Sequence, residues 1–179
     1  MIPGRAVDPA EWHALAEVFA PPEPGQLGPA AGVLPAALAD RLESVTPERL
    51  ATQYVRLFVN AMPEVPCPPY ASVYLEGGVH GAVTHRIRML YRKWGLDTTE
   101  VPDHFAVEAA FVATLLSAAG AENGDPGPKA EAAADLAWLS THLLAWAPAF
   151  LRRVRDHDRT GLYGEAAGWA LGLLERLRS

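Results

Sequence analysis

Apolar side chains recur at helical spacing along most of the chain, and capping residues mark where two of the helices begin. Asp8-Pro9-Ala10-Glu11 combines an acidic cap, a proline at the first helical position and a glutamate three residues after the cap. Thr46-Pro47-Glu48-Arg49 opens another helix in the same way, with a threonine cap followed by proline and glutamate. Each opening precedes an apolar face with a period near 3.6, so both predict amphipathic helices. The first is expected to end at Pro21-Pro22.

Further stretches with the same period complete an all-helical pattern. We expect a short helix around residues 34–42, one over 79–94 that stops at Gly95, and one from about 104 to 116. A further helix over 136–154 is interrupted or kinked by Pro148, and Thr160 caps a last helix. Abundant alanine and leucine with scarce isoleucine also favour helix over sheet. The predicted fold is an all-α bundle of about seven helices.

The domain organisation follows from length and from one flexible stretch. At 179 residues the chain is expected to form a single domain, residues 1–179, with a substantial core. Gly120, Asn123-Gly124-Asp125 and Pro126-Gly127-Pro128 mark residues 118–129 as a connection. This connection divides the chain into possible halves, 1–118 and 129–179.

Residues 60–78 contain four prolines and are expected to be non-helical, with extended geometry. Tyr70, Ser72 and Tyr74 follow Pro68-Pro69. A rigid loop that presents aromatic and hydroxyl groups suits a peptide-binding wall, because aromatic rings bury large area at small entropic cost. The residue types equally allow both tyrosines to anchor the loop on the core. For Tyr54, Leu57 and Phe58, on the preceding helix, a core position is the stronger interpretation.

The stretch from Val101 predicts a further helix start. Pro102 disfavours helical geometry in the residue before it, and Asp103 is a good N-cap. His104 would then occupy the first helical position, partly exposed beside the positive end of the helix dipole. Val107, Phe111 and Leu115 provide a buried stripe after it. Without other information, this is a capped core helix.

Composition excludes several classes of protein. A net charge of −6 argues against a general binder of nucleic-acid phosphates. A single cysteine, Cys67, rules out an intramolecular disulfide and a multi-thiolate metal site. His80 and His85 lie five residues apart rather than four, so we predict no zinc site. No apolar run approaches the ~20 residues that span a bilayer, and no signal-peptide pattern begins the chain, so we expect a cytoplasmic protein.

Candidate catalytic residues are few. Phosphate-loop, dinucleotide-binding and nucleophile-elbow motifs are missing from the sequence. Asp103 with His104 is the one pair that resembles an acid–base couple, but adjacent residues at a helix start rarely point at one atom. We therefore expect a protein that is not an enzyme and that holds no cofactor.

Three segments in order resemble the TorD/DmsD/NarJ-like family of cytoplasmic redox-enzyme maturation chaperones. They are Tyr54-Val55-Arg56-Leu57-Phe58, then Pro68-Pro69-Tyr70-Ala71-Ser72-Val73-Tyr74, then Pro102-Asp103-His104 with Glu108 four residues after the histidine. The resemblance covers roughly residues 47–175 and includes Thr141 to Phe150. The family often has an acidic residue directly before the Pro-Asp-His motif, where this chain has Val101, with Glu100 one position further back.

The resemblance implies a chaperone specific for one molybdopterin-dependent oxidoreductase. Such a chaperone binds the partner's twin-arginine signal peptide, holds the apoenzyme for cofactor insertion and delays its export. The residues that the resemblance places in peptide binding are Leu57, Phe58, Pro69, Tyr70, Ser72, Tyr74, Asp103, His104 and Glu108. Leu57, Phe58 and the tyrosines would form the apolar part, and Asp103 and Glu108 the acidic part, of a groove for a basic and then apolar segment.

Two other functions remain open at this stage. An assembly chaperone of the nitrate-reductase type would bind the mature catalytic subunit instead of an exported signal. A small helical hydrolase or nucleotide-binding protein would use Asp103 and His104, without support from a phosphate loop. The protein is expected to be a monomer or a domain-swapped homodimer. We expect it to bind no nucleic acid and not to insert directly into a membrane.

Overall fold

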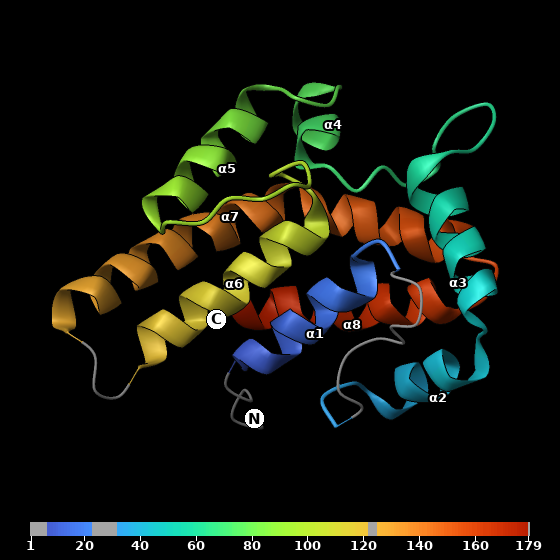
Figure 1. Ribbon diagram of the computed structural model, residues 1–179, viewed down its shortest axis with the longest axis horizontal. Helices are drawn as coiled ribbons and strands as arrows, with labels where there is room; N and C mark the ends of the chain where they lie inside the picture. Colours follow the sequence, from blue (N-terminus) through green and yellow to red (C-terminus); the bar gives the residue numbers. More distant parts are fainter. Residues whose placement is uncertain (1–6, 23–31, 122–124, 179) are drawn as a thin grey trace.

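The computed structural model describes residues 7–22, 32–121 and 125–178, and over these residues the chain is helical without a named strand. Figure 1 shows the arrangement. The elements are α1 (Pro9–Phe19), α2 (Ala36–Ser44), α3 (Pro47–Tyr54), the π-helical segment η1 (Val55–Val59), α4 (Ala71–Glu76), α5 (Ala82–Lys93), α6 (Phe105–Gly120), α7 (Pro126–His157) and α8 (Leu162–Leu177). The all-α prediction is confirmed, with eight α-helices in the described part where about seven were expected.

Four helices form the centre of the bundle. α1 packs on α6, α6 on α7, α7 on α8, and α8 again touches α1. α7 runs along the whole length of the molecule behind α6, and α4 and α5 cover its upper side in Figure 1. α6 lies between α1 and α7 and buries eight of its sixteen residues, nearly all of them apolar.

Aromatic rings join these elements into one core. The Phe19 ring of α1 lies 5.0 Å from Phe105 of α6, 5.9 Å from Phe150 of α7 and 6.0 Å from Tyr163 of α8, between ring centroids. Phe58 of η1 lies 6.1 Å from Phe19. Such tilted and edge-on pairs add to the free energy gained by burying the rings. The core therefore includes residues on both sides of the connection at 118–129.

Two predicted helix starts and one predicted stop are confirmed. Asp8 Oδ1 accepts a hydrogen bond from the Ala10 amide at 2.9 Å, and Thr46 Oγ1 accepts from the Arg49 amide at 3.4 Å. α5 ends at Lys93, and Gly95 follows with φ +69°. A left-handed residue at this place is favoured for glycine, which has no Cβ to clash.

Two local expectations are wrong, and so is one of the two alternatives of a third. Residues 71–76, expected to be non-helical, form α4, which starts directly after the prolines. Pro148 does not interrupt α7, because the turns on both sides of it bury large apolar side chains such as Trp146 and Phe150; a kink at Pro148, the other alternative, stays a prediction. The N-cap of α8 is Gly161, and the Thr160 hydroxyl accepts only a long hydrogen bond, 3.4 Å, from the Leu162 amide.

Within the described residues, none of the helices is long and apolar enough to span a bilayer. The proposed division into halves 1–118 and 129–179 stays a prediction. The connection between them is shorter than the expected 118–129, because α6 extends to Gly120 and α7 begins at Pro126. Residues 122–124 lie outside the described residues.

Candidate functional site: a junction between the proline-rich loop and helix α6

The second and third family-like motifs meet in space. The Ala71 amide donates to the Asp103 carbonyl at 3.0 Å, and the Phe105 amide donates to the Pro69 carbonyl at 2.8 Å. These bonds form an isolated antiparallel bridge between Tyr70 and His104. We call residues 69–72 and 103–105, held together in this way, the junction.

Asp103 is buried in the junction and caps a different helix from the one predicted. Its Oδ2 atom accepts from the Ser72 amide at 2.8 Å, in the first turn of α4. Its Oδ1 atom and the Ser72 hydroxyl have no hydrogen-bond partner among the described residues. The prediction that Asp103 caps α6 is therefore wrong.

His104 takes the capping role. It is the N-cap of α6, with extended φ −72° and ψ 136°, and its Nδ1 atom accepts from the Ala106 amide at 3.1 Å. The bridge to Tyr70 holds His104 extended, so α6 begins one residue later than expected. His104 is only 1% exposed, which corrects the expectation of a partly exposed histidine.

Burial determines the protonation of the junction. It lowers the pKa of His104 to about 4, against the opposing charges of Glu100 and Asp103. The imidazole is therefore neutral near pH 7, as its role as an acceptor at Nδ1 requires. The Tyr70 ring stands edge-on to His104, with centroids 5.4 Å apart. Burial, and then the charge of Glu100, raises the pKa of Tyr70.

Glu108 lies one turn further along α6 and points toward α7. Its Oε1 atom lies 2.9 Å from His142 Nε2, and its Oε2 atom accepts from Trp146 Nε1 at 3.3 Å. The carboxyl is fully buried, and burial raises its pKa, while the hydrogen bonds from His142 and Trp146 oppose the rise. Sequence reasoning did not assign these two partners, because only the packing of α6 on α7 brings them to Glu108.

Of the apolar residues predicted to bind the peptide, some are buried and others are partly exposed. Leu57 is 0% and Phe58 3% exposed, both inside the core, so neither offers a surface to a peptide in this structure. Pro69 is buried at the junction. Tyr70 and Tyr74 are partly exposed. Tyr74 packs its ring at 5.7 Å from Trp146, which supports the interpretation that it anchors the loop on the core.

The junction is not arranged for catalysis. Asp103 and His104 each accept from an amide of a different helix, so they do not form an acid–base couple. In the described part of the chain, no group of three or more histidine, cysteine or acidic side chains could hold a metal ion. Burial raises the pKa of the Cys67 thiol to about 11, which disfavours a reactive thiolate.

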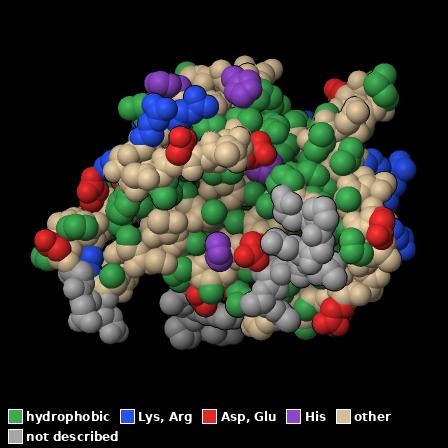
Figure 2. All heavy atoms as spheres, viewed as in Figure 1, with side chains coloured by type: hydrophobic (Ala, Val, Ile, Leu, Met, Phe, Trp, Pro, Cys, Tyr) green, Lys and Arg blue, Asp and Glu red, His purple; other side chains and the backbone are tan. Residues whose placement is uncertain are grey.

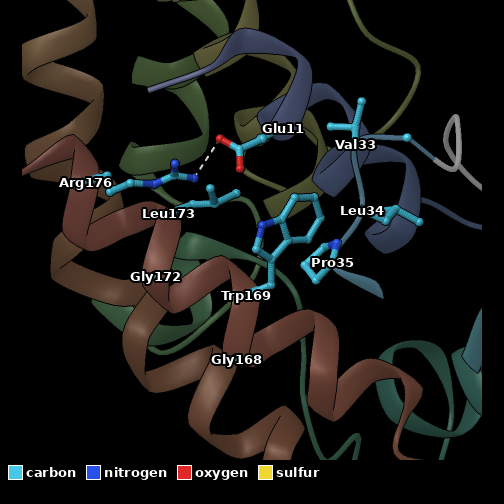
Figure 3. A pocket seen from close by; sticks show the side chains of 10 residues that line it. Glu11, Val33, Leu34, Pro35, Gly168, Trp169, Gly172, Leu173 and Arg176 are labelled. Atoms are coloured by element: carbon cyan, nitrogen blue, oxygen red, sulfur yellow. Dashed lines mark hydrogen bonds and ion pairs between the residues drawn. The ribbon is translucent and has the colours of Figure 1, made fainter. Parts of the chain in front are cut away.

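A separate pocket of about 510 Å³ lies between α1, residues 32–35 and α8. Figure 3 shows the Arg176 guanidinium reaching Glu11 at one end and Trp169 forming a wall. Arg176 Nη2 donates to Glu11 Oε2 at 2.7 Å. None of the predicted site residues lines this pocket.

Comparison with known proteins identifies the family and the relatives that the chain resembles. The family model described as nitrate reductase delta subunit matches residues 25–152. Proteins named chaperone protein TorD are 33% identical over 113 residues in Vibrio cholerae, covering 60% of this chain and 51% of the relative, and 30% identical over 120 residues in Photobacterium profundum, covering 64% and 55%. The chain thus spans about half the length of these curated relatives.

A solved structure described as a redox enzyme maturation protein, from Archaeoglobus fulgidus, matches the whole fold. It superimposes with a TM-score of 0.70 at 25% sequence identity and covers 100% of this chain and 99% of its own. The named relatives are chaperones and a maturation protein, in line with the prediction of a protein without catalytic activity. The chain belongs to the family of the nitrate reductase delta subunit, the TorD-like family of redox-enzyme maturation proteins that its motifs resemble.

Proposed function

We propose that this protein is a cytoplasmic chaperone for a molybdopterin-dependent oxidoreductase. It binds the twin-arginine signal peptide or the apo form of that enzyme, assists cofactor insertion and delays export until the enzyme is complete. Membership of a family whose named relatives are chaperones supports the general role. The finer role, recognition of the signal peptide, is supported by the surface that the junction builds.

The junction positions partly exposed aromatic rings, and an acidic side chain lies near them. Pairing of residues 69–72 with 103–105 fixes α4, and with it the partly exposed rings of Tyr70 and Tyr74. Glu100 is partly exposed and close enough for its charge to act on both Tyr70 and His104. This combination is the single observation that carries the proposal.

The signal peptide suits such a surface. A twin-arginine signal is a basic segment followed by an apolar one, so its receptor needs an acidic group next to aromatic area. Glu100 would receive an arginine, while Tyr70 and Tyr74 would pack against the apolar part. Asp103, His104, Glu108 and Ser72 are buried, so their role in this proposal is to position the surface rather than to touch the peptide.

A second candidate is an assembly chaperone for a nitrate-reductase-type catalytic subunit. The match to the nitrate reductase delta subunit model favours this candidate. In this variant, the same surface binds a segment of the mature subunit, and the twin-arginine pair is not required.

Isothermal titration calorimetry with a twin-arginine signal peptide from a molybdoenzyme encoded beside this protein tests the proposal. We expect a Kd of about 1 μM or lower, near −8 kcal/mol, and clearly weaker binding of a twin-lysine control. Glu100→Gln and Tyr70→Ala should each weaken binding while circular dichroism remains unchanged. If the folded protein binds neither peptide, but captures the apo catalytic subunit lacking its signal, the mature-subunit role replaces the signal-peptide role.

Asp103→Asn separates a positioning carboxylate from one that contacts the peptide. Asparagine keeps a side-chain oxygen for the Ser72 amide but removes the charge. Because Asp103 is 0% exposed, we expect the Kd for the peptide and its salt dependence to change little. A large loss of affinity in a variant of normal stability would show that the Asp103 charge itself is used in recognition.

A further inference from the structure

Helix α5 concentrates positive charge in an acidic protein. It holds four of the fifteen lysines and arginines and none of the twenty-one acidic residues, although the net charge of the chain is −6. Figure 2 shows Lys and Arg side chains gathered over α5, close to histidine. Such asymmetry directs association with negatively charged partners.

The cations on the side of α5 that faces α7 already have partners. Lys93 Nζ lies 2.6 Å from Asp135 and 2.9 Å from Glu131, both on α7. The Arg86 guanidinium lies 4.6 Å from the centre of the Trp138 ring. These contacts, together with the hydrogen bond from Trp94 Nε1 to Asp135, hold α5 on the outside of the bundle.

On the outward side of α5, the basic side chains have no such partners among the described residues. His85, Arg88 and Arg92 are exposed and form no ion pair or side-chain hydrogen bond among the described residues. Met89 lies between them and is 50% exposed. These four residues occupy positions i, i+3, i+4 and i+7, so they share one face of the helix. We call them the basic face of α5.

We propose that the basic face of α5 docks an acidic amphipathic helix of a partner protein, with carboxylates on Arg88 and Arg92 and an apolar side chain on Met89. The charge of the face requires an acidic occupant, and the exposed thioether at its centre provides an adaptable apolar contact. The spacing along one face of α5 matches the spacing of side chains on a second helix lying beside it. This surface is distinct from the junction, so the inference does not depend on the proposed signal-peptide role.

Other anionic partners fit less well. Nucleic-acid binding requires many cations along a groove, and the protein is acidic as a whole. Membrane-surface helices turn a wide apolar face to the lipid, whereas α5 buries Ile87 and Tyr91 in the protein. The geometry therefore favours an acidic protein helix over both.

Fluorescence anisotropy with a labelled synthetic helix tests the proposal. The probe carries glutamates at i, i+3 and i+7 and leucine at i+4, and its control carries glutamine at the three glutamate positions. We expect the full chain to bind the acidic probe, to bind the glutamine control at least about tenfold more weakly, and to lose affinity as salt is raised.

Charge-reversed variants locate the binding. Arg88→Glu/Arg92→Glu should reduce affinity at least about tenfold, and Met89→Ala should weaken binding to a smaller extent. The matched control is Arg152→Glu/Arg155→Glu on α7, which also reverses two exposed arginines and should bind normally. All four substituted arginines are on the surface, so thermal unfolding should remain close to that of the natural chain.

Three outcomes would overturn the proposal. The first is that the acidic probe does not bind, and the second is that both double variants lose binding equally. The third is that the chain binds anionic phosphatidylserine vesicles or a DNA duplex through α5 but does not bind the helix. A milder pair, Arg88→Gln/Arg92→Gln, keeps the result interpretable if the charge-reversed chain is unstable.

Discussion

His104 and Asp103 show how neighbouring residues in one motif serve different helices. His104 caps α6 through Nδ1, whereas Asp103 reaches 31 residues back in sequence to the first turn of α4. The two caps meet at the bridge between Tyr70 and His104, so this short motif fixes both the loop and the helix. A neutral His104 is part of this arrangement because a protonated Nδ1 could not accept the Ala106 hydrogen bond.

His104 is expected to make the protein less stable in mild acid. Its pKa is about 4 in the folded chain and about 6.5 when unfolded, so the unfolded chain binds more protons between these values. The free energy of unfolding therefore falls as the pH is lowered from about 6.5 to 4, by about 3 kcal/mol for this group at most. Denaturant unfolding at several pH values between these limits measures the effect.

His104→Asn is the informative variant for this prediction. Asparagine is a good N-cap but does not titrate, so it should keep most of the stability at pH 7 and flatten the pH dependence. Glu100 and Asp103 face the same imidazole and remain unchanged as internal controls. An unaltered slope of stability against pH in His104→Asn would mean that another group is responsible.

At the scale of the elements, the residues at their borders and in their surroundings determine where α5, α7 and α8 begin, continue or end. α7 continues through Pro148 because core packing holds both of its sides, whereas α5 stops where Gly95 adopts a left-handed conformation. Gly161, with φ +81°, is also in the left-handed region but stands at the start of α8, as its N-cap. A Cβ at Gly95 would meet open space, but a Cβ at Gly161 would lie 2.5 Å from Arg41 Nη1.

The two glycines provide a matched test of helix borders. Gly95→Ala should lower the free energy of unfolding by about 1–2 kcal/mol, because alanine is strained in the left-handed region. Gly161→Ala should cost this amount plus the displacement of Arg41, which donates to the Thr160 carbonyl at 3.4 Å and pairs with Glu165 of α8.

A double-mutant cycle with Arg41→Ala isolates the second contribution. In the Arg41→Ala background, Gly161→Ala should cost about as much as Gly95→Ala, as measured by urea unfolding. If the extra cost of Gly161→Ala persists without Arg41, the backbone of α8, and not the arginine, is its source.

At the scale of the whole molecule, one aromatic core joins the two predicted halves. Phe19 and Phe105 belong to the first half and Phe150 and Tyr163 to the second, and their rings are in contact. Burial of these rings contributes to the hydrophobic free energy that α1, α6, α7 and α8 share. This arrangement favours unfolding of the chain as one unit.

We therefore expect a single unfolding transition. Circular dichroism and tryptophan fluorescence should give coincident curves in urea, and Phe19→Ala should shift both together, by about 3–5 kcal/mol. Separate transitions, or a shift in only one of the two signals, would show that residues 1–118 and 129–179 unfold independently.

More of the fold than of the site could be predicted from the sequence. The helical period identified most helices, and capping chemistry placed the starts of α1 and α3, since both depend on residues close together in the chain. The family-like motifs identified the residues of the junction. Their partners could not be predicted: His142 and Trp146 lie 34 and 38 residues from Glu108 and meet it only through helix packing.

The sequence by itself determined the helical class, the caps of α1 and α3 and the family to which the chain belongs, because each depends on short-range pattern. Only the tertiary structure decided that Asp103 supports α4 and that His142 and Trp146 meet Glu108. It also decided which cations of α5 are paired with α7 and which face outward. The physical reason is that burial and long-range hydrogen bonds arise between elements, and a helical period does not specify which elements will meet.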